Sequence, residues 1–425
     1  MPLPTLPNEL IADIFGKVVE TEKLDERDER IMADLCLVSK SFLPLARQQL
    51  YRVASLKLVP VDLTPALSES DEDVDDHEGP AEPTLNSLLL VATLATSPHL
   101  ARFVNVLCLN LGGRAGDEGA EMVREVFKTC SGINEMEIRE YWDVGTGSGA
   151  FGDVLHNGGS RIRILRLHGG ILREDGPLSL ALLQLQLEEL HLVNHFASLQ
   201  GEFVYPSPSS QLRSFSYVFV HHLNFNSVLA SSHDSLRSLQ LMSRGQPFDL
   251  SAFAHLETVH YECHHNSGAT VDDITTTLAS LPSSLKSLRL SSICWEPAQS
   301  KQHFYGQLGE RRVLHSLPPS LVYLDLQEIF LTPEYILDFV NSPSASPNLR
   351  SLGVPPSLFH RRIMDDLRDN EHPSQDYRDL LRRKRTVEED KRLDQYSAEQ
   401  EAFAVAVTEA AEGRGIAIVA ELHYM

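Results

Sequence analysis

One short pattern of apolar and polar positions recurs along most of the chain: apolar-x-x-apolar-x-apolar. It is clearest in residues 236–241, 285–290 and 321–326, where every apolar position is leucine. From residue 104 onward, successive copies begin 20 to 36 residues apart, which is typical of a repeat protein. Looser copies bring the number to eleven, and they begin at Val53, Val104, Ile133, Ile162, Leu187, Leu212, Leu256 and Leu349.

Each copy predicts a short β-strand with one buried face. The last two apolar residues of a copy alternate with polar ones, which is the period of a strand. A strand this short cannot bury its apolar face alone, so the next copy must cover it and the copies should stack into a solenoid. Two copies follow almost identical segments, Leu281-Pro-Ser-Ser and Leu317-Pro-Pro-Ser, in which proline favours a turn into the strand.

The copies resemble leucine-rich repeats over residues 51–420. The resemblance implies an α/β fold, in which short parallel strands form an arc and are joined by helices or loops. The asparagine or cysteine that this family usually carries at the ninth position is missing, so the solenoid should be irregular. A chance imitation of a repeat by leucine-rich amphipathic elements is the alternative.

Residues 1–50 have a different pattern, which predicts three short helices. Residues 10–19 carry two adjacent rows of apolar residues with a spacing of four, and these rows make a wide apolar stripe. A second apolar set follows a charged connection at residues 20–30, and Pro44 restarts the chain into a third helix. About fifty residues cannot bury this much apolar surface internally, so part of it should face outward and bind a partner.

Residues 6–15, Leu-Pro-Asn-Glu-Leu-Ile-Ala-Asp-Ile-Phe, and residues 35–42, Leu-Cys-Leu-Val-Ser-Lys-Ser-Phe, resemble the two halves of an F-box motif of the fungal style. The connection between the halves is longer and more charged than usual. The resemblance implies binding to a Skp-family adaptor and, through it, to a cullin–RING complex. Alternatively, these helices only cap the solenoid. The matching adaptor-binding positions are Leu6, Pro7, Leu10, Ile11, Ile14, Phe15, Leu35, Val38, Ser39 and Phe42.

By this resemblance, the chain would be a non-catalytic substrate receptor of an SCF-type ubiquitin ligase, which acts by holding a protein substrate near activated ubiquitin. The alternative is a leucine-rich-repeat scaffold outside any ligase. We expect the substrate on the concave side of the repeats, where residues between the buried leucines point outward. These residues are Glu137, Arg139, Arg166, His168, His191, Gln240, His260, Arg289, Tyr323, Asp325 and Gln327.

Two charged segments interrupt the repeats. Residues 66–83 include a run in which seven of ten residues are acidic, and we expect a disordered loop there rather than a calcium site. Residues 361–396 mix both charge signs around Arg382-Arg383-Lys384-Arg385, which favours a solvated helix face over a nuclear import signal. In residues 397–425, an apolar stripe and the segment Ile416–Val419 predict a closing helix and a last strand. The stripe consists of Ala402, Phe403, Ala406, Val407 and Ala410.

The composition narrows the classes of partner and compartment. The chain has 37 Lys plus Arg against 59 Asp plus Glu, and the net charge of −22 disfavours binding to nucleic acid or to an anionic membrane surface. The longest apolar stretch is too short to cross a bilayer, and the amino terminus lacks the features of a secretory signal. Five scattered cysteines fit a reducing compartment, the cytoplasm or the nucleus.

Three further patterns suggest chemistry only weakly. Gly147-x-Gly149-x-x-Gly152 fits a dinucleotide fingerprint by letter but lacks a βαβ unit around it. His260-x-x-Cys263-His264-His265 and His191-x-x-x-His195 contain plausible zinc ligands, yet neighbouring residues on a strand point to opposite faces. We therefore expect no metal, no cofactor and no catalytic activity, although a catalytic pair assembled from distant repeats stays open.

Overall fold

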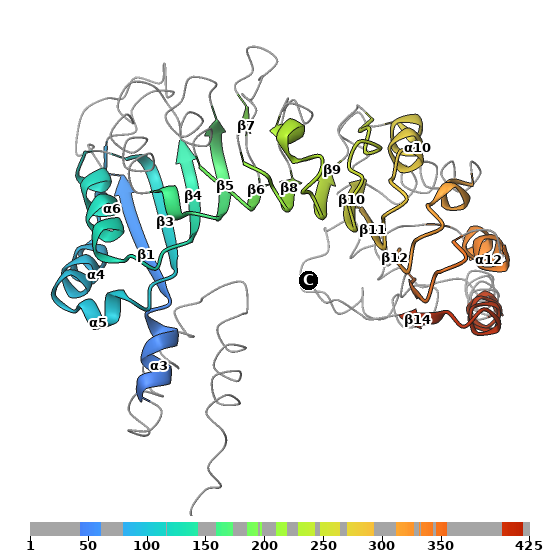
Figure 1. Ribbon diagram of the computed structural model, residues 1–425, viewed down its shortest axis with the longest axis horizontal. Coiled ribbons are helices and arrows are strands. Elements are labelled where there is room, and N and C mark those ends of the chain that lie inside the picture. The colour runs from blue at the N-terminus through green and yellow to red at the C-terminus, as the bar shows by residue number, and fades with distance from the viewer. Residues whose placement is uncertain are drawn as a thin grey trace, which may run out of the picture. The chain divides into compact units, whose positions relative to one another are not determined.

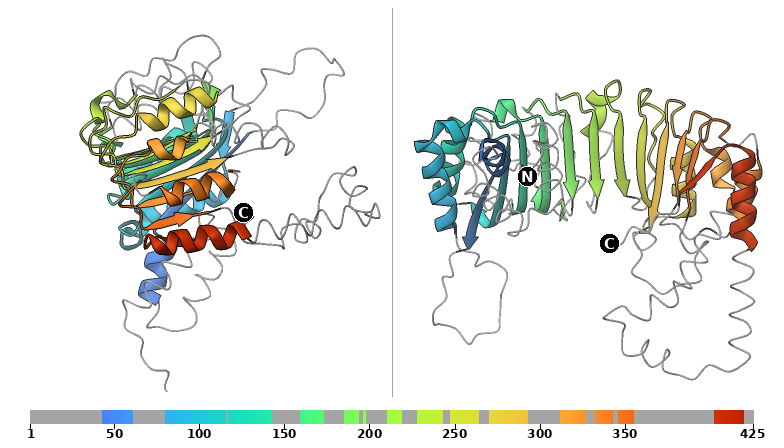
Figure 2. Two further views of the ribbon diagram at one scale, coloured as in Figure 1. Left: turned by 90° about the vertical axis from the view of Figure 1, so that its right-hand side faces the viewer. Right: turned by 90° about the horizontal axis from the view of Figure 1, so that it is seen from below.

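The computed structural model describes residues 43–60, 80–115, 117–142, 159–172, 185–193, 196–197, 210–218, 228–242, 247–263, 270–292, 312–326, 331, 333–342, 346–354 and 402–419. The chain divides into two compact units between Ser232 and His233. In each unit, short strands lie side by side and most neighbours are parallel (Figures 1 and 2). The predicted α/β repeat architecture is thus present in both units.

The first described element of the first unit is the helix Leu43–Leu50, where the sequence predicts the third helix. Strands β1, β3, β4, β5, β6 and β8 then follow as parallel neighbours, while β2 is antiparallel to β1 and β7 extends the pairing of β5. Helices α4 and α6 contact each other, and α4 also contacts β1 (Figure 1). The elements are α3 (Leu43–Leu50), β1 (Val53–Pro60), β2 (Pro80–Pro83), α4 (Leu85–Thr96), α5 (Pro98–Ala101), β3 (Val106–Ala115), α6 (Asp117–Thr129), β4 (Glu135–Trp142), η1 (Gly159–Arg161), β5 (Ile164–Leu172), β6 (Glu189–Val193), β7 (Phe196–Ala197), β8 (Ser214–Val218) and η2 (Ala230–Ser232).

The second unit is a parallel run of strands in which β9 to β14 pair in chain order. Helix α10 begins at a capping box, because the Thr270 hydroxyl accepts from the Asp273 backbone N–H and the Asp273 carboxylate accepts in return from the Thr270 backbone. Figure 1 shows α10 and α12 on the same side of the strands. The elements are β9 (Ser238–Met242), β10 (Thr258–Cys263), α10 (Val271–Ala279), β11 (Ser287–Ser292), η4 (Val313–Ser316), β12 (Tyr323–Asp325), α12 (Pro333–Asn341), β13 (Ser351–Gly353) and β14 (Ala417–Val419).

The core of each unit is built from the apolar positions of the repeat. The second apolar position of successive copies forms a continuous row across the paired strands, and each of its members is at most 2% exposed. Burying one such side chain typically contributes about 1.5–3 kcal/mol, so the row binds each strand to its neighbours. The row consists of Ala54, Leu107, Met136, Leu165, Leu190 and Phe215 in the first unit, and of Leu239, Val259, Leu288, Leu324 and Leu352 in the second.

The two similar proline segments form the same local structure. Leu285 donates its N–H to the Pro282 carbonyl at 3.1 Å, and Leu321 donates to Pro318 at 3.2 Å. The serine just before each strand copy then links neighbouring repeats: the Ser284 hydroxyl donates to the Leu256 carbonyl at 2.8 Å. The Ser320 hydroxyl likewise donates to the carbonyl of residue 285 at 2.7 Å. These serines satisfy turn carbonyls that would otherwise lack a donor.

The register of the first copy differs from the prediction. Ala54 lies beside Leu107 and Leu56 beside Leu109, so the copy that corresponds to Val104 begins at Tyr51 rather than at Val53. The segment allows both frames, because Ala54, Leu56 and Leu58 alternate and are all buried. Only pairing with the neighbouring strand selects one of them.

Residues 80–83 correct the boundary of the predicted acidic loop. They form strand β2, in which Pro83 lies beside Leu58 and Ala81 beside Ala115. Backbone pairing with two strands holds this end of the segment in place, despite its two prolines. Residues 61–79 lie outside the described residues, as does the predicted charged segment at 361–396.

The carboxy-terminal prediction is confirmed for the strand, and the helix needs one correction. Residues 402–413 are helical, and β14 pairs in parallel with β13. The helix buries Ala404, Val407 and Ala411, whereas Ala402 is exposed. The buried face therefore consists of Val407 with Ala404, three residues before it, and Ala411, four residues after it, and is rotated from the predicted stripe.

Candidate functional site

In the first unit, polar side chains occupy the position between the second and third buried residues of each repeat. The strand pairing places Cys108 beside Glu137, Glu137 beside Arg166, and Arg166 beside His191. Ser216 on β8 continues this first-unit row. Three residues that the sequence predicts for substrate binding, Glu137, Arg166 and His191, thus lie on three adjacent strands.

Glu137 is the centre of the first-unit row. One carboxylate oxygen, Oε1, lies 2.6 Å from Arg139 Nε and 3.5 Å from His168 Nε2. The other oxygen, Oε2, accepts a hydrogen bond from Cys108 Sγ at 3.7 Å. The Glu137 side chain is only 15% exposed, whereas Arg139 is 50% exposed. A partly buried carboxylate therefore organises a cation, an imidazole and a thiol.

Two more carboxylates complete this face. The Arg166 guanidinium forms an ion pair with Glu135 on the neighbouring strand, and His191 Nε2 lies 3.5 Å from Glu189 Oε2 on its own strand. Residues two apart on a strand share one face, so both carboxylates lie on the face of the row. The first unit thus offers both charge signs, in an alternating order rather than as a cluster of arginines.

Burial sets the protonation states of the first-unit row. Burial lowers the pKa of His168 and outweighs the raising effect of the Glu137 carboxylate. Burial also lowers the pKa of His191, and the Arg166 guanidinium adds to that shift. Burial, followed by the Glu137 charge, raises the pKa of Cys108 to about 12. At neutral pH the two imidazoles are uncharged and the thiol keeps its proton, which makes Cys108 a poor nucleophile.

The second unit carries its own row, in which Gln240, His260, Arg289, Asp325 and Gly353 lie beside one another on successive strands. Arg289 Nε lies 3.7 Å from Asp325 Oδ2. The same oxygen accepts a hydrogen bond from the Tyr323 hydroxyl at 3.3 Å. The second-unit row therefore includes a carboxylate held between two side chains that the sequence also predicts for the site.

The first two members of the second-unit row each contact a further side chain, one a carboxylate and the other a hydroxyl. Gln240 Nε2 donates to Glu262 Oε1 at 2.7 Å, and His260 Nε2 lies 2.7 Å from the Ser291 hydroxyl. Burial and the neighbouring Arg289 charge lower the pKa of His260 to about 4, so this imidazole is neutral at pH 7. His191 and His260 thus act as neutral hydrogen-bonding groups.

Asp325 departs from the expectation of an outward-pointing residue. It is only 4% exposed, because Tyr323 and Arg289 cover its carboxylate. Gly353 allows this arrangement, since a Cβ atom there would lie 2.6 Å from Asp325 Oδ1 and 3.2 Å from its Cα. Asp325 therefore orients Arg289 rather than presenting a charge to a partner.

Sequence reasoning missed several members of these networks, namely Cys108, Glu135, Glu189, Glu262 and Ser291. A signal for three of them exists in the sequence: Glu135, Glu189 and Glu262 each stand two residues from a row member. In a strand this spacing places both residues on one face. The partners that they contact, however, come mostly from other repeats.

All ten predicted adaptor-binding residues lie outside the described residues, and so do Gln327, His195, His264, His265 and the glycines of residues 147–152. Within the part of the chain that the structure describes, no group of three or more His, Cys, Asp or Glu residues is arranged to hold a metal ion. No helix among the described residues is long and apolar enough to cross a bilayer.

No family model and no curated protein matches the sequence. Among solved structures, the chain is similar to the one described as the crystal structure of the Rad7 and Elc1 complex in yeast. The two chains share 14% sequence identity over 83% of this chain and 93% of that chain, with a TM-score of 0.34. At a TM-score this low, the fold rests on the strand pairing described above.

Proposed function

We propose that this protein is a non-catalytic receptor that joins an adaptor-binding helical segment to a substrate-binding repeat surface. The observation that carries the proposal is the order of parts: the F-box-like residues 6–42 are followed by helix α3 and then by repeats that begin with β1. In the finer form of the proposal, the adaptor belongs to the Skp family and the assembly is an SCF-type ubiquitin ligase. Such a receptor performs no bond chemistry and accelerates the reaction by proximity.

The strand faces support a protein substrate. Arg139 is 50% exposed, Arg289 and His168 are each 38% exposed, and all three are oriented by carboxylates or by neighbouring strands. Exposed arginine heads with fixed orientation suit hydrogen bonds to backbone carbonyls and carboxylates of a partner. Because these faces carry both charge signs, the best partner carries both signs as well.

The first test removes one apolar anchor from the F-box-like segment. Leu10→Asp places a charge in the expected interface, and the loss of a large anchor costs about 2 kcal/mol or more, so adaptor affinity should fall about thirtyfold or more. Affinity is measured by titrating the purified full-length chain with a Skp-family adaptor, after circular dichroism shows that the repeats stay folded.

Ala12→Asp is the matched control. It adds the same charge at a position that the motif leaves unspecified, and we expect binding close to that of the unaltered chain. Equal affinity of Leu10→Asp and the unaltered chain would contradict the adaptor assignment. Co-purification of a cullin and of ubiquitinated clients from cells then separates a ligase receptor from a scaffold outside any ligase.

A further inference from the structure

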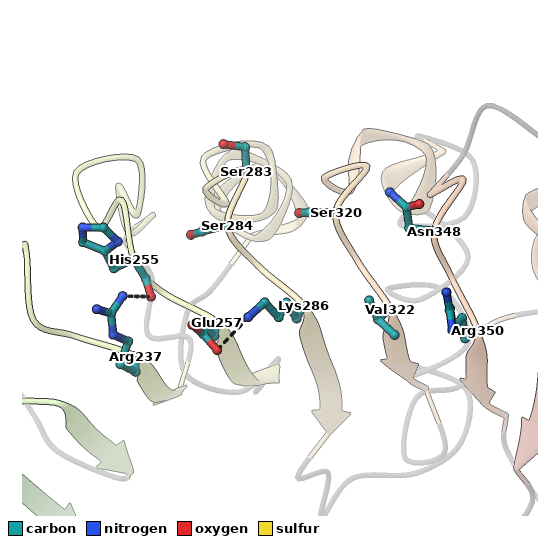
Figure 3. A pocket seen from close by; sticks show the side chains of 10 residues that line it. All are labelled: Arg237, His255, Glu257, Ser283, Ser284, Lys286, Ser320, Val322, Asn348 and Arg350. Atoms are coloured by element: carbon teal, nitrogen blue, oxygen red, sulfur yellow. Dashed lines mark hydrogen bonds and ion pairs between the residues drawn. The ribbon is translucent and has the colours of Figure 1, made fainter.

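The second unit has an open groove at the edge where its strands begin, away from the polar row on the strand face. Its volume is about 580 Å³. Figure 3 shows that the residues just before successive strands, Arg237, Glu257, Lys286, Val322 and Arg350, stand beside one another along it. We call this feature the strand-start groove. Val322 is the one hydrophobic residue among the described residues that line it, so the groove suits a polar ligand rather than an apolar one.

Backbone hydrogen bonds fix the spacing of the groove residues. Glu257 donates its N–H to the Arg237 carbonyl at 2.8 Å, and Lys286 donates to Glu257 at 2.9 Å. This ladder continues with the Val322 N–H, which donates to the Lys286 carbonyl, and the Arg350 N–H, which donates to the Val322 carbonyl, each at 2.8 Å. The three cations, Arg237, Lys286 and Arg350, therefore occur on every second strand. Since parallel strands lie about 4.8 Å apart, the backbone positions that carry neighbouring cations stand about 10 Å apart.

The cationic side chains are accessible. Lys286 Nζ pairs with Glu257 Oε2 at 3.1 Å, but the two side chains are 60% and 45% exposed, so the pair is weak and exchangeable. Arg237 donates one N–H to the His255 carbonyl at 3.0 Å, and a guanidinium has further donors. Within the described residues, the Arg350 side chain has no ion-pair partner. The groove thus presents three cations and one competing carboxylate.

The corresponding positions of the first unit repeat only part of this pattern. There Arg213 pairs with Glu188 at 3.6 Å, and the Arg163 guanidinium donates to the Gln186 carbonyl at 2.9 Å. Arg52, Asn105 and Asn134 hold the preceding positions of that ladder, so only two of its cations, Arg163 and Arg213, stand on alternate strands. Among the described residues, a run of three cations on alternate strands is therefore a feature of the second unit, and the repeat architecture alone does not require it.

We propose that the strand-start groove binds an acidic peptide segment of a partner protein, with one anionic side chain at every third residue. An extended polyproline II segment has three residues per turn and a rise of about 3.1 Å, so residues i, i+3 and i+6 share one face and stand about 9 Å apart. This spacing matches the distance between the cations. The anion is a carboxylate or a phosphate, since both accept hydrogen bonds from guanidinium and ammonium groups.

The test measures fluorescence anisotropy of labelled peptides with the full-length chain. The probe Glu-Pro-Ala-Glu-Pro-Ala-Glu carries glutamate at every third residue, and Glu-Glu-Glu-Pro-Ala-Pro-Ala has the same composition with the charges together. We expect the spaced probe to bind at least about threefold more tightly, since only it reaches all three cations. A third probe, with phosphoserine in place of glutamate in the spaced sequence, distinguishes phosphate from carboxylate.

Two kinds of variant should move the affinity in opposite directions. Lys286→Ala and Arg350→Ala each remove one contact and should weaken the spaced probe about fivefold. Glu257→Gln removes the competing carboxylate and should strengthen it about twofold. Lys128→Ala alters another exposed lysine that pairs with a glutamate, on α6 in the first unit, and should leave the affinity unchanged.

The proposal would be overturned if neither spaced probe binds, or if the spaced and clustered probes bind equally. It would also be overturned if the affinity of the spaced probe does not change in the Lys286→Ala and Glu257→Gln variants, or if a single-stranded oligonucleotide of equal charge binds more tightly. This site does not depend on adaptor binding, so Leu10→Asp should retain the peptide. A failure at the groove is therefore distinguishable from a failure of the proposed function.

Discussion

In the second unit, Arg289 and Asp325 on the strand face are separated by 3.7 Å, with side chains 38% and 6% exposed. In the strand-start groove, Lys286 and Glu257 are closer, at 3.1 Å, yet 60% and 45% exposed. Distance alone would rank the groove pair as the stronger. Burial reverses the order, because a charge removed from water depends on its partner, whereas an exposed charge can return to water. The strand face thus uses its charges to order the fold, and the groove keeps them available.

The largest effect should come from matched carboxamide substitutions in the two pairs. Asp325→Asn leaves a buried site without the charge that orients Arg289 and accepts from Tyr323, and should lower the free energy of unfolding by about 2–3 kcal/mol. Glu257→Gln in the groove should lower it by less than about 1 kcal/mol. Urea unfolding followed by circular dichroism compares them. Equal losses would mean that burial does not separate the two pairs.

A smaller effect on stability is expected when one methyl group is added on the strand face and, for comparison, one in the strand-start groove. Gly353→Ala places a carbon against the Asp325 carboxylate and should cost about 1–2 kcal/mol, because the strand face has no space for it. Ser283→Thr adds a methyl group at an exposed position of the groove and should be nearly neutral. Hydrogen exchange of peptides that cover β12 and β13 reports the difference.

A double substitution sharpens this second prediction. Gly353→Ala should cost less in a chain that already carries Asp325→Ala, since the displaced carboxylate is then absent. Additive losses in the double variant would instead place the strain elsewhere in β13.

The smallest effect concerns pH. The pKa of His260 is about 4 in the folded chain and 6.5 ordinarily. Between these two pH values the imidazole is therefore protonated in the unfolded chain and neutral in the folded chain. Stability is therefore complete above pH 6.5 and falls as the pH drops toward 4, by about 1 kcal/mol between pH 6 and pH 5. His260→Gln should flatten urea midpoints measured across this range, with a residual slope from His168 and His191, whose pKa values are lowered in the same direction. An unchanged slope would contradict the assignment to His260.

Much of the strand face was predictable, because alternation is a local property. The outward positions of Glu137, Arg166, His191 and Arg289 follow from the period of the strand and need no knowledge of neighbours. The burial of Asp325 did not follow, since it depends on a tyrosine two residues away, an arginine from the preceding strand and a glycine from the next one. The groove was also missed, because its cations occupy the first variable position of the repeat motif, just before each strand, and become neighbours only when the strands pair.

The sequence by itself determined where strands begin, which residues face inward and that the last strand lies near the carboxy terminus, since hydrophobic burial acts on a pattern readable within a few residues. The tertiary structure decided the frame of the first copy, the partners of each charge and the regular spacing of Arg237, Lys286 and Arg350. Neighbours across the parallel strands are 20 to 66 residues apart in this chain, with spacers of unequal length. Side-chain pairing therefore depends on register, which only the folded backbone fixes.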